Sequence, residues 1–117
     1  MRVDNAAPPP RWRQGRLDDG IPPTLPAELV TILAADASVR IERIVSRGHA
    51  SPPGFWYDQD EDELVLVVTG AAHLAIEGAD VLALGPGDWV ELPRHCRHRV
   101  EWTDPDRDTI WLAIFRR

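Results

Sequence analysis

Cysteine is almost absent from the chain: Cys96 is its single thiol among 117 residues. Disulfide frameworks need several cysteines and an oxidising compartment, so none can form within this chain. No run approaches the ~20 consecutive apolar residues of a membrane helix. The N-terminal "MRVDNAAPPPRWRQG" lacks the continuous apolar segment of a secretory signal. These absences predict a cytoplasmic protein with no membrane partner.

Positive charge is also scarce, because the formal net charge is −6. Nucleic-acid binding draws on clustered Lys and Arg to contact phosphates. The one local basic group is Arg94, Arg97 and Arg99, which we interpret as the solvated face of a strand. We therefore predict no nucleic-acid partner.

Several enzyme signatures are missing as well. The chain contains no serine or cysteine nucleophile triad, no phosphate loop and no dinucleotide-binding fingerprint. Its composition, 44% hydrophobic and 27% charged, is that of an ordinary globular protein. Its length is enough for one hydrophobic core but not for two.

Proline marks the first boundary in the chain. Residues 1–23 contain "PPP" and "IPP", which cannot hydrogen-bond into a sheet interior, so we predict an extended, partly disordered arm. Within it, Trp12 is expected to dock onto the domain or onto a partner subunit. Residues 24–117 are predicted to form a single domain. Its first element is predicted as a short amphipathic helix over about 26–35, with Pro26 in the first turn and apolar side chains sharing one face.

From Val39 onward the sequence is typical of β-structure. Short apolar or alternating segments follow one another and are separated by Gly, Pro and Asp, which indicates a sandwich or small barrel. The predicted strands cover 39–45, 63–68, 73–77, 81–84, 88–92, 96–102 and 108–115.

Side-chain alternation points two polar residues into this β domain. In "CRHRVEWT", His98, Val100 and Trp102 share one face and the charged residues share the other, so we expect His98 to point inward. Glu63 begins the apolar strand 63–68, where an unpaired carboxylate is costly. Glu63 therefore needs a cation, a hydrogen-bond donor or water, and His98 is an available partner. A lone inward histidine that is simply a satisfied core residue is the alternative.

The residues now assembled resemble the two motifs of the cupin superfamily. Glu63 is followed by six residues and then Gly70, as at the end of the first motif. In "GPGDWVELPRHCRH", Gly87, Pro93 and His98 have the spacing of the second motif. The resemblance covers roughly residues 39–115. It departs from the family at both histidines of the first motif, at His95 where glycine is usual, and at Trp102 where asparagine is usual.

The resemblance implies an all-β fold, a double-stranded β-helix built as a small barrel. It also implies a divalent metal site inside the barrel at the positions that correspond to Tyr57, Gln59, Glu63 and His98. The candidate ions are Mn, Fe, Ni and Zn. Such an oxygen-rich set favours Mn, Fe or similar octahedral ions over tightly tetrahedral structural zinc, and it holds them more weakly than three histidines would. Tyr57 and Glu63 would be the catalytic candidates, and Cys96 shares the parity of His98 and is a possible extra ligand. The alternative is a metal-free Glu63–His98 hydrogen bond within a polar network.

The sequence leaves the function open between three possibilities. The first is a metal-dependent enzyme, an oxygenase, isomerase or lyase acting on a small molecule. The second is a non-catalytic barrel that binds a small molecule, with an apolar pocket expected to be lined by Phe55, Trp56, Val65, Val100 and Trp102. The third is a structural homodimer without a retained site. The resemblance itself implies a homodimer.

Overall fold

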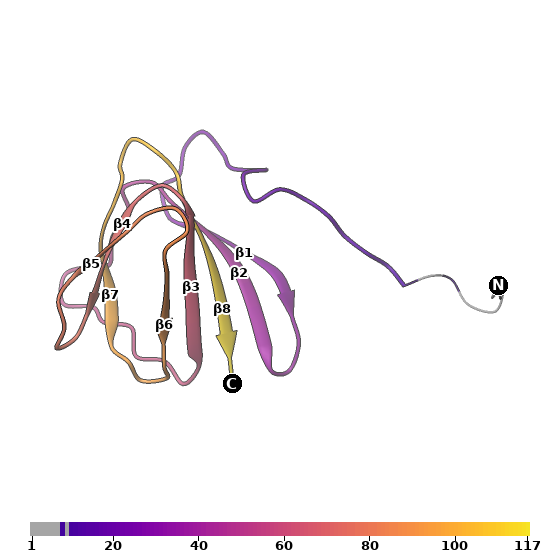
Figure 1. Cartoon of the computed structure of the whole chain (residues 1–117). Coiled ribbons are helices and arrows are strands. Elements are labelled where there is room, and N and C mark those ends of the chain that lie inside the picture. Colours follow the sequence, from indigo (N-terminus) through magenta and orange to yellow (C-terminus); the bar gives the residue numbers. More distant parts are fainter. Residues whose placement is uncertain (1–7, 9) are drawn as a thin grey trace.

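The computed structural model describes residues 8 and 10–117 and contains, within that range, eight strands and no helix (Figure 1). The all-β prediction is therefore confirmed. The strands are β1 (Leu29–Ala35), β2 (Val39–Ser46), β3 (Asp62–Thr69), β4 (Ala72–Ile76), β5 (Leu82–Leu84), β6 (Trp89–Leu92), β7 (His98–Thr103) and β8 (Thr109–Arg116). It follows that no helix among the described residues could cross a membrane.

The strands form two antiparallel sheets. One has the order β1-β2-β8-β3-β6 and the other has the order β5-β4-β7. Because β8 pairs with both β2 and β3, segments from the two ends of the β domain lie side by side. The hydrophobic core lies between the sheets and is formed by alternate residues of several strands: Val65, Val67, Ala72, Leu74, Leu84, Leu92, Trp111, Ala113 and Phe115.

The helix predicted over 26–35 is wrong, because residues 29–35 form β1 and pair with β2. The segment contains Val30, Thr31 and Ile32, whose branched side chains favour a strand over a helix. Pairing with β2 also satisfies backbone groups that would otherwise form an open sheet edge. The apolar residues of this short segment fit both the 3.6-residue period of a helix and the two-residue period of a strand. The hydrogen bonds to β2 favour the strand.

The N-terminal segment before β1 has neither helix nor strand in its described part. Its part nearest β1 lies against the five-stranded sheet, and its earlier residues extend away from the domain (Figure 1). Buried Arg43 holds it by donating to the backbone carbonyls of Leu17 at 3.0 Å and Asp19 at 2.5 Å. Further out, Trp12 is 79% exposed. The arm predicted for 1–23 thus has an anchored portion, while its residues 1–7 and 9 lie outside the described residues.

Candidate functional site

A cavity of about 180 Å³ lies inside the barrel, with walls from both sheets. All four side chains at the implied metal positions line it. The lining residues are Glu28, Val30, Glu42, Ile44, Tyr57, Gln59, Glu63, Val65, Leu74, Leu92, His98, Val100, Trp111 and Phe115. The cavity is therefore mostly apolar with a few polar groups, which is the general character of small-molecule sites.

Tyr57 and Gln59 lie in a loop that is hydrogen-bonded to the neighbourhood of β7. The Tyr57 N–H donates to the His98 carbonyl at 2.7 Å, and the His98 N–H donates to the Tyr57 carbonyl at 3.2 Å. The Gln59 carbonyl accepts from the His95 N–H at 2.8 Å. The Tyr57 and His98 rings stack with centroids 5.2 Å apart. These backbone hydrogen bonds and the ring stacking position the Tyr57 and Gln59 side chains at the cavity.

Glu63 projects into the cavity from β3, opposite Leu92 of β6 and Phe115 of β8. It is only 8% exposed. Its Oε1 lies 3.4 Å from His98 Nε2, longer than the 2.7–2.9 Å of a charge-assisted hydrogen bond. Among the described residues, neither Glu63 Oε1 nor Gln59 Oε1 has a hydrogen-bond partner, although both are buried. Two acceptor oxygens therefore lie within the barrel without a donor.

The orientation of the His98 ring follows from its other nitrogen. Nδ1 lies 2.8 Å from the carbonyl oxygen of Cys96, which can only accept, so Nδ1 carries the proton. Nε2 is thereby directed at Glu63. Burial by itself would lower the pKa of His98, but the Glu63 carboxylate and the Cys96 carbonyl together raise the pKa above its ordinary value.

Tyr57 contributes a phenol hydroxyl to the cavity. Burial raises the pKa of its phenol, and the negative charges of Glu28 and Glu63 raise the pKa further. The hydroxyl therefore stays protonated at neutral pH and can donate a hydrogen bond to a bound molecule.

The raised pKa of His98 predicts a pH dependence of stability. The folded state binds this proton more tightly than the unfolded chain, so the stabilisation is complete below the unfolded pKa of ~6.5 and is lost as pH rises through the folded pKa. Urea unfolding of chelator-treated protein between pH 6 and pH 9 should show this decline. The same slope in Glu63→Gln would contradict the assignment, because that variant lacks the carboxylate that raises the pKa.

Two of the five residues expected to line a pocket do line the cavity, namely Val65 and Val100. Phe55 and Trp56 do not: Phe55 packs edge-on against Tyr57 with 43% of its surface exposed. Trp56 lies beneath the guanidinium groups of Arg97 and Arg99, about 6 Å from each.

Trp102 is also absent from the cavity lining, and the reason is a β-bulge. Leu74 pairs with Val100 but His73 pairs with Trp102, so Glu101 is an extra residue of β7. An extra residue reverses which face the following side chains occupy. Trp102 is therefore 38% exposed and stacks on His73, whereas Thr103 turns inward and is 1% exposed.

At His95, the backbone adopts a conformation that suits the glycine usual in cupins, although the residue itself is a histidine. His95 has a φ of 64°, a left-handed conformation that the usual glycine adopts without cost. Its ring contacts Asp58 at 2.7 Å and Asp60 at 3.2 Å on the surface. Cys96 is partly buried against the core and does not line the cavity, while its carbonyl orients His98.

Glu28 and Glu42 line the cavity too, and sequence reasoning missed both. Alternation in 39–45 already placed Glu42 on one face with Arg40 and Ile44, so that signal was present. Glu28 had no such signal, because its position depends on residues 29–35 forming a strand.

The donor set can accept a divalent ion. The Nε2 of a neutral His98 and the buried oxygens of Glu63 and Gln59 are all lone-pair donors, and two of them lack a partner. Within the described part of the chain, no three His, Cys, Asp or Glu side chains gather to hold a metal. The set therefore has two strong donors, assisted by an amide and a phenol, which suits mixed N/O ions bound with modest affinity.

Comparison with known proteins identifies the relatives of this barrel. The family model described as "Cupin domain" matches residues 41–115. No curated protein matches the chain. A crystal structure from Ralstonia eutropha JMP134, described as a candidate mannose-6-phosphate isomerase, is 45% identical over 90% of this chain and 98% of its own, with a TM-score of 0.87.

More distant structures share the fold. A cupin superfamily protein from Desulfitobacterium hafniense is 21% identical over 92% of this chain and 93% of its own, with a TM-score of 0.72. An RmlC-like cupin from Methanocaldococcus jannaschii, described as a double-stranded β-helix, is 17% identical over 77% of this chain and 80% of its own, with a TM-score of 0.63. The predicted double-stranded β-helix is thereby confirmed, and the chain belongs to the cupin family.

Proposed function

We propose that this cupin binds a small molecule in its barrel cavity, and that Tyr57, Gln59, Glu63 and His98 hold a divalent metal ion there. One observation carries the proposal. Glu63 Oε1 is buried without a hydrogen-bond partner and faces His98 Nε2 across 3.4 Å inside a cavity. An ionised carboxylate in such a place is stable only with a cation or donor beside it.

Each protein group has a distinct part in this proposal. His98 and Glu63 are the principal ligands, and Gln59 contributes an amide oxygen. The protonated phenol of Tyr57 is the weakest ligand of the set, and its hydroxyl can also donate a hydrogen bond to the bound molecule. The apolar walls exclude water. Mn, Fe, Ni or Zn would act as a Lewis acid toward an oxygen of the ligand. The name of the Ralstonia relative makes an isomerase one candidate reaction, beside an oxygenase or a lyase.

A non-catalytic, metal-free barrel is the second candidate. It is favoured by the raised pKa of His98, since a protonated imidazole would itself neutralise Glu63. The cavity would then bind a small molecule without an ion.

Metal analysis separates the two candidates. Protein purified without chelator is expected to contain up to one equivalent of Mn, Fe, Ni or Zn, and the same ions should raise its melting temperature. His98→Ala should lose both effects because it removes the stronger neutral ligand. His73→Ala is the matched control, because His73 stacks on Trp102 outside the cavity.

Equal metal content in wild type, His98→Ala and His73→Ala would remove His98 from the ligand set. If the wild-type protein contains none of these ions and gains no thermal stability from any of them, the metal site is excluded. The metal-free binding barrel is then the remaining candidate. Failure of a thermal-shift screen of small acids, sugars, phenols and amines would then contradict ligand binding itself.

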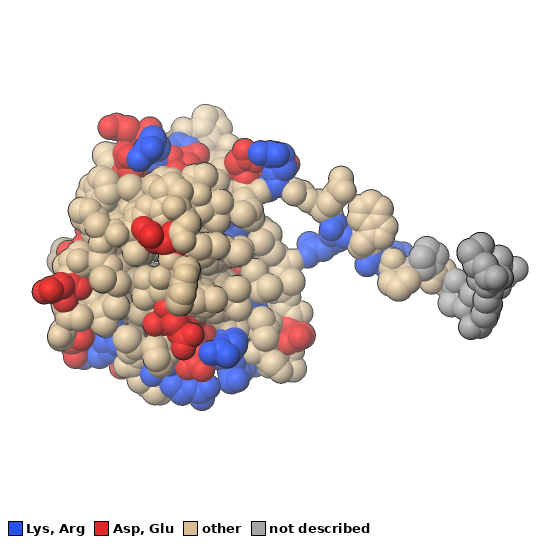
Figure 2. All heavy atoms as spheres, in the orientation of Figure 1, with Lys and Arg blue, Asp and Glu red and all other residues tan. Residues whose placement is uncertain are grey.

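We further propose that the protein is a homodimer formed through an outer groove. This groove lies on the side of the five-stranded sheet away from the cavity and is lined by Leu64, Leu66, Trp89, Glu91, Leu112 and Ile114. The surface seen over β3, β6 and β8 in Figure 2 is largely uncharged. Trp89 is 64% exposed there. Isologous pairing would cover the same apolar groove on both copies.

Trp89→Glu is expected to convert the dimer to a monomer at micromolar concentration, because it replaces an exposed apolar ring of the groove with a second carboxylate beside Glu91. Sedimentation velocity measures the change. Val81→Glu is the control: Val81 is 54% exposed but lies outside the outer groove. A wild-type protein that sediments only as a monomer would contradict the dimer.

A further inference from the structure

Most of the ionisable side chains in the cavity wall are acidic. Among the described residues, three carboxylates line it, those of Glu28, Glu42 and Glu63, and no arginine does. The chain contains no lysine at all. Apart from His98, no lining side chain among the described residues can carry a positive charge. The wall itself therefore offers an anionic ligand no permanent cation, and only a metal ion bound at Glu63 and His98 would supply one.

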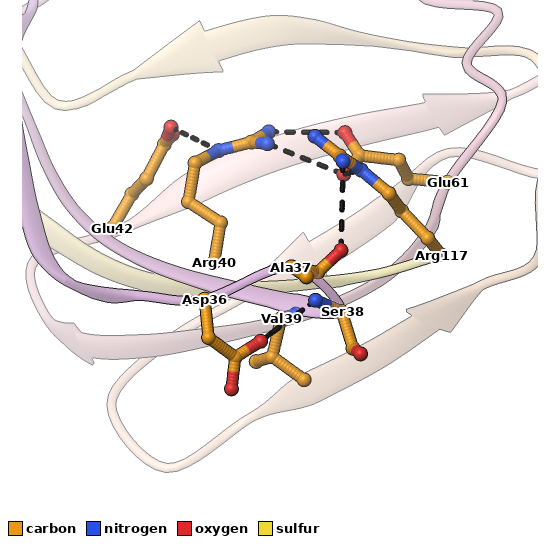
Figure 3. A network of polar contacts seen from close by, with 8 residues as sticks. All are labelled: Asp36, Ala37, Ser38, Val39, Arg40, Glu42, Glu61 and Arg117. Carbon is orange, nitrogen blue, oxygen red and sulfur yellow. Dashed lines mark hydrogen bonds and ion pairs between the residues drawn. The ribbon is translucent and has the colours of Figure 1, made fainter.

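Arg40 is the arginine that contacts the lining residues, and its guanidinium is already engaged. Figure 3 shows it between Glu42, at 2.8 Å, and Glu61, at 3.1 Å. It also lies over the Phe115 ring, 4.3 Å from the centroid. Binding a phosphate would require Arg40 to leave two carboxylates. The next arginine of β2, Arg43, faces the other way and holds the N-terminal segment.

The three carboxylates differ in how they are neutralised. Glu63 has His98, or a metal ion in its place, and Glu42 has Arg40. Within residues 10–117, the partner of Glu28 is a hydroxyl: Ser46 Oγ donates to it at 2.5 Å while accepting from Trp111 Nε1 at 3.2 Å. A neutral donor leaves the carboxylate charge in place. The negative charge without a cationic partner is therefore on Glu28, which lines the cavity and is exposed to solvent.

Aromatic rings are the second feature of the cavity wall. Tyr57, Trp111 and Phe115 all line the cavity. One face of Tyr57 stacks on His98, and the Phe115 ring already lies under Arg40. The remaining ring faces can each attract a cation by about 0.5–2 kcal/mol when it lies within ~6 Å of the centroid. Carboxylates together with aromatic walls are the combination that binds ammonium groups.

Resting on the proposed function, we infer that the molecule bound in the cavity is a small organic cation, with an ammonium group directed at Glu28, and not a sugar phosphate. A second acceptor lies in the same cavity, because the buried Glu63 Oε1 has no hydrogen-bond partner among the described residues. The cavity volume of about 180 Å³ lies below the ~300–1,000 Å³ of typical ligand pockets, so the cation must be small. The phosphate ester in the name of the Ralstonia relative has no matching arginine or lysine side chain in this wall.

Isothermal titration calorimetry with three probes tests the inference on the full chain. Choline carries the cation, 3,3-dimethylbutanol is its uncharged isostere, and mannose 6-phosphate carries the phosphate. We expect choline to bind at least tenfold more tightly than 3,3-dimethylbutanol, and mannose 6-phosphate to give no heat at the same concentrations.

Glu28→Gln should weaken choline binding about fivefold, the effect of losing one partly solvated charge. Because Glu28 is exposed, this variant should fold normally, which its melting temperature checks. Glu77→Gln is the matched control: it removes one negative charge at an exposed ion pair with Arg97, outside the cavity. Choline affinity should be unchanged in it.

Equal affinity for choline and 3,3-dimethylbutanol, or no choline binding, would overturn the inference. Binding of mannose 6-phosphate that His98→Ala abolishes would also overturn the cationic class, yet it would leave the proposed cavity function standing. Choline binding that is the same in wild type, Glu28→Gln and His98→Ala would place the cation outside the cavity and overturn the inference as well.

Discussion

Gly70→Ala is expected to lower the free energy of unfolding by about 3–5 kcal/mol. Gly70 has a φ of 89°, which L-residues rarely adopt. A Cβ there would lie 2.5 Å from the Thr109 Cα and 2.7 Å from the Asp108 carbonyl oxygen. Both are backbone atoms at the start of β8, so the clash cannot be relieved by a side-chain rotation. Urea unfolding followed by circular dichroism measures the loss.

Gly78→Ala provides the matched control for this prediction. Gly78 has nearly the same φ, 81°, but a Cβ there would have no heavy atom within 4 Å. Its cost should be about 1–2 kcal/mol, the penalty of the left-handed conformation alone. If both variants lost the same stability, the close approach of Gly70 to β8 would have no energetic consequence.

Trp111→Ala is expected to destabilise the fold by about 3–5 kcal/mol, as large-to-small changes of buried aromatics do. Trp111 is 4% exposed and belongs to the core cluster. Its loss also enlarges the cavity and removes the donor to Ser46, which hydrogen-bonds Glu28. The effect should therefore appear both in thermal unfolding and in choline affinity.

Two further variants divide this effect into its parts. Trp111→Phe keeps most of the buried ring but removes the Nε1 donor, so it should cost about 1–2 kcal/mol. Trp12→Ala removes a tryptophan that is 79% exposed and should change stability by no more than ~0.5 kcal/mol. A Trp111→Ala loss as small as that of Trp12→Ala would contradict the assignment of Trp111 to the core.

Sequence reasoning identified the polar end of the cavity. The parity of "CRHRVEWT" pointed His98 inward, and the cost of burying Glu63 alone required a partner for it. Both side chains do line one cavity, 3.4 Å apart at their nearest polar atoms. The ligand role of Tyr57, Gln59, Glu63 and His98 stays a prediction.

What the sequence by itself determined is the β class and the inward direction of single residues within unbroken strands. Alternation with a period of two is a local property, so it can be read without knowing a strand's neighbours. Only the tertiary structure decided that residues 29–35 are a strand, because the hydrogen bonds of β2 select it. The same is true of Trp102, turned outward by one bulge against β4, and of Glu28, brought to the cavity wall by the adjoining strand β1. Pairing between strands distant along the chain sets these positions, and no local pattern records such pairing.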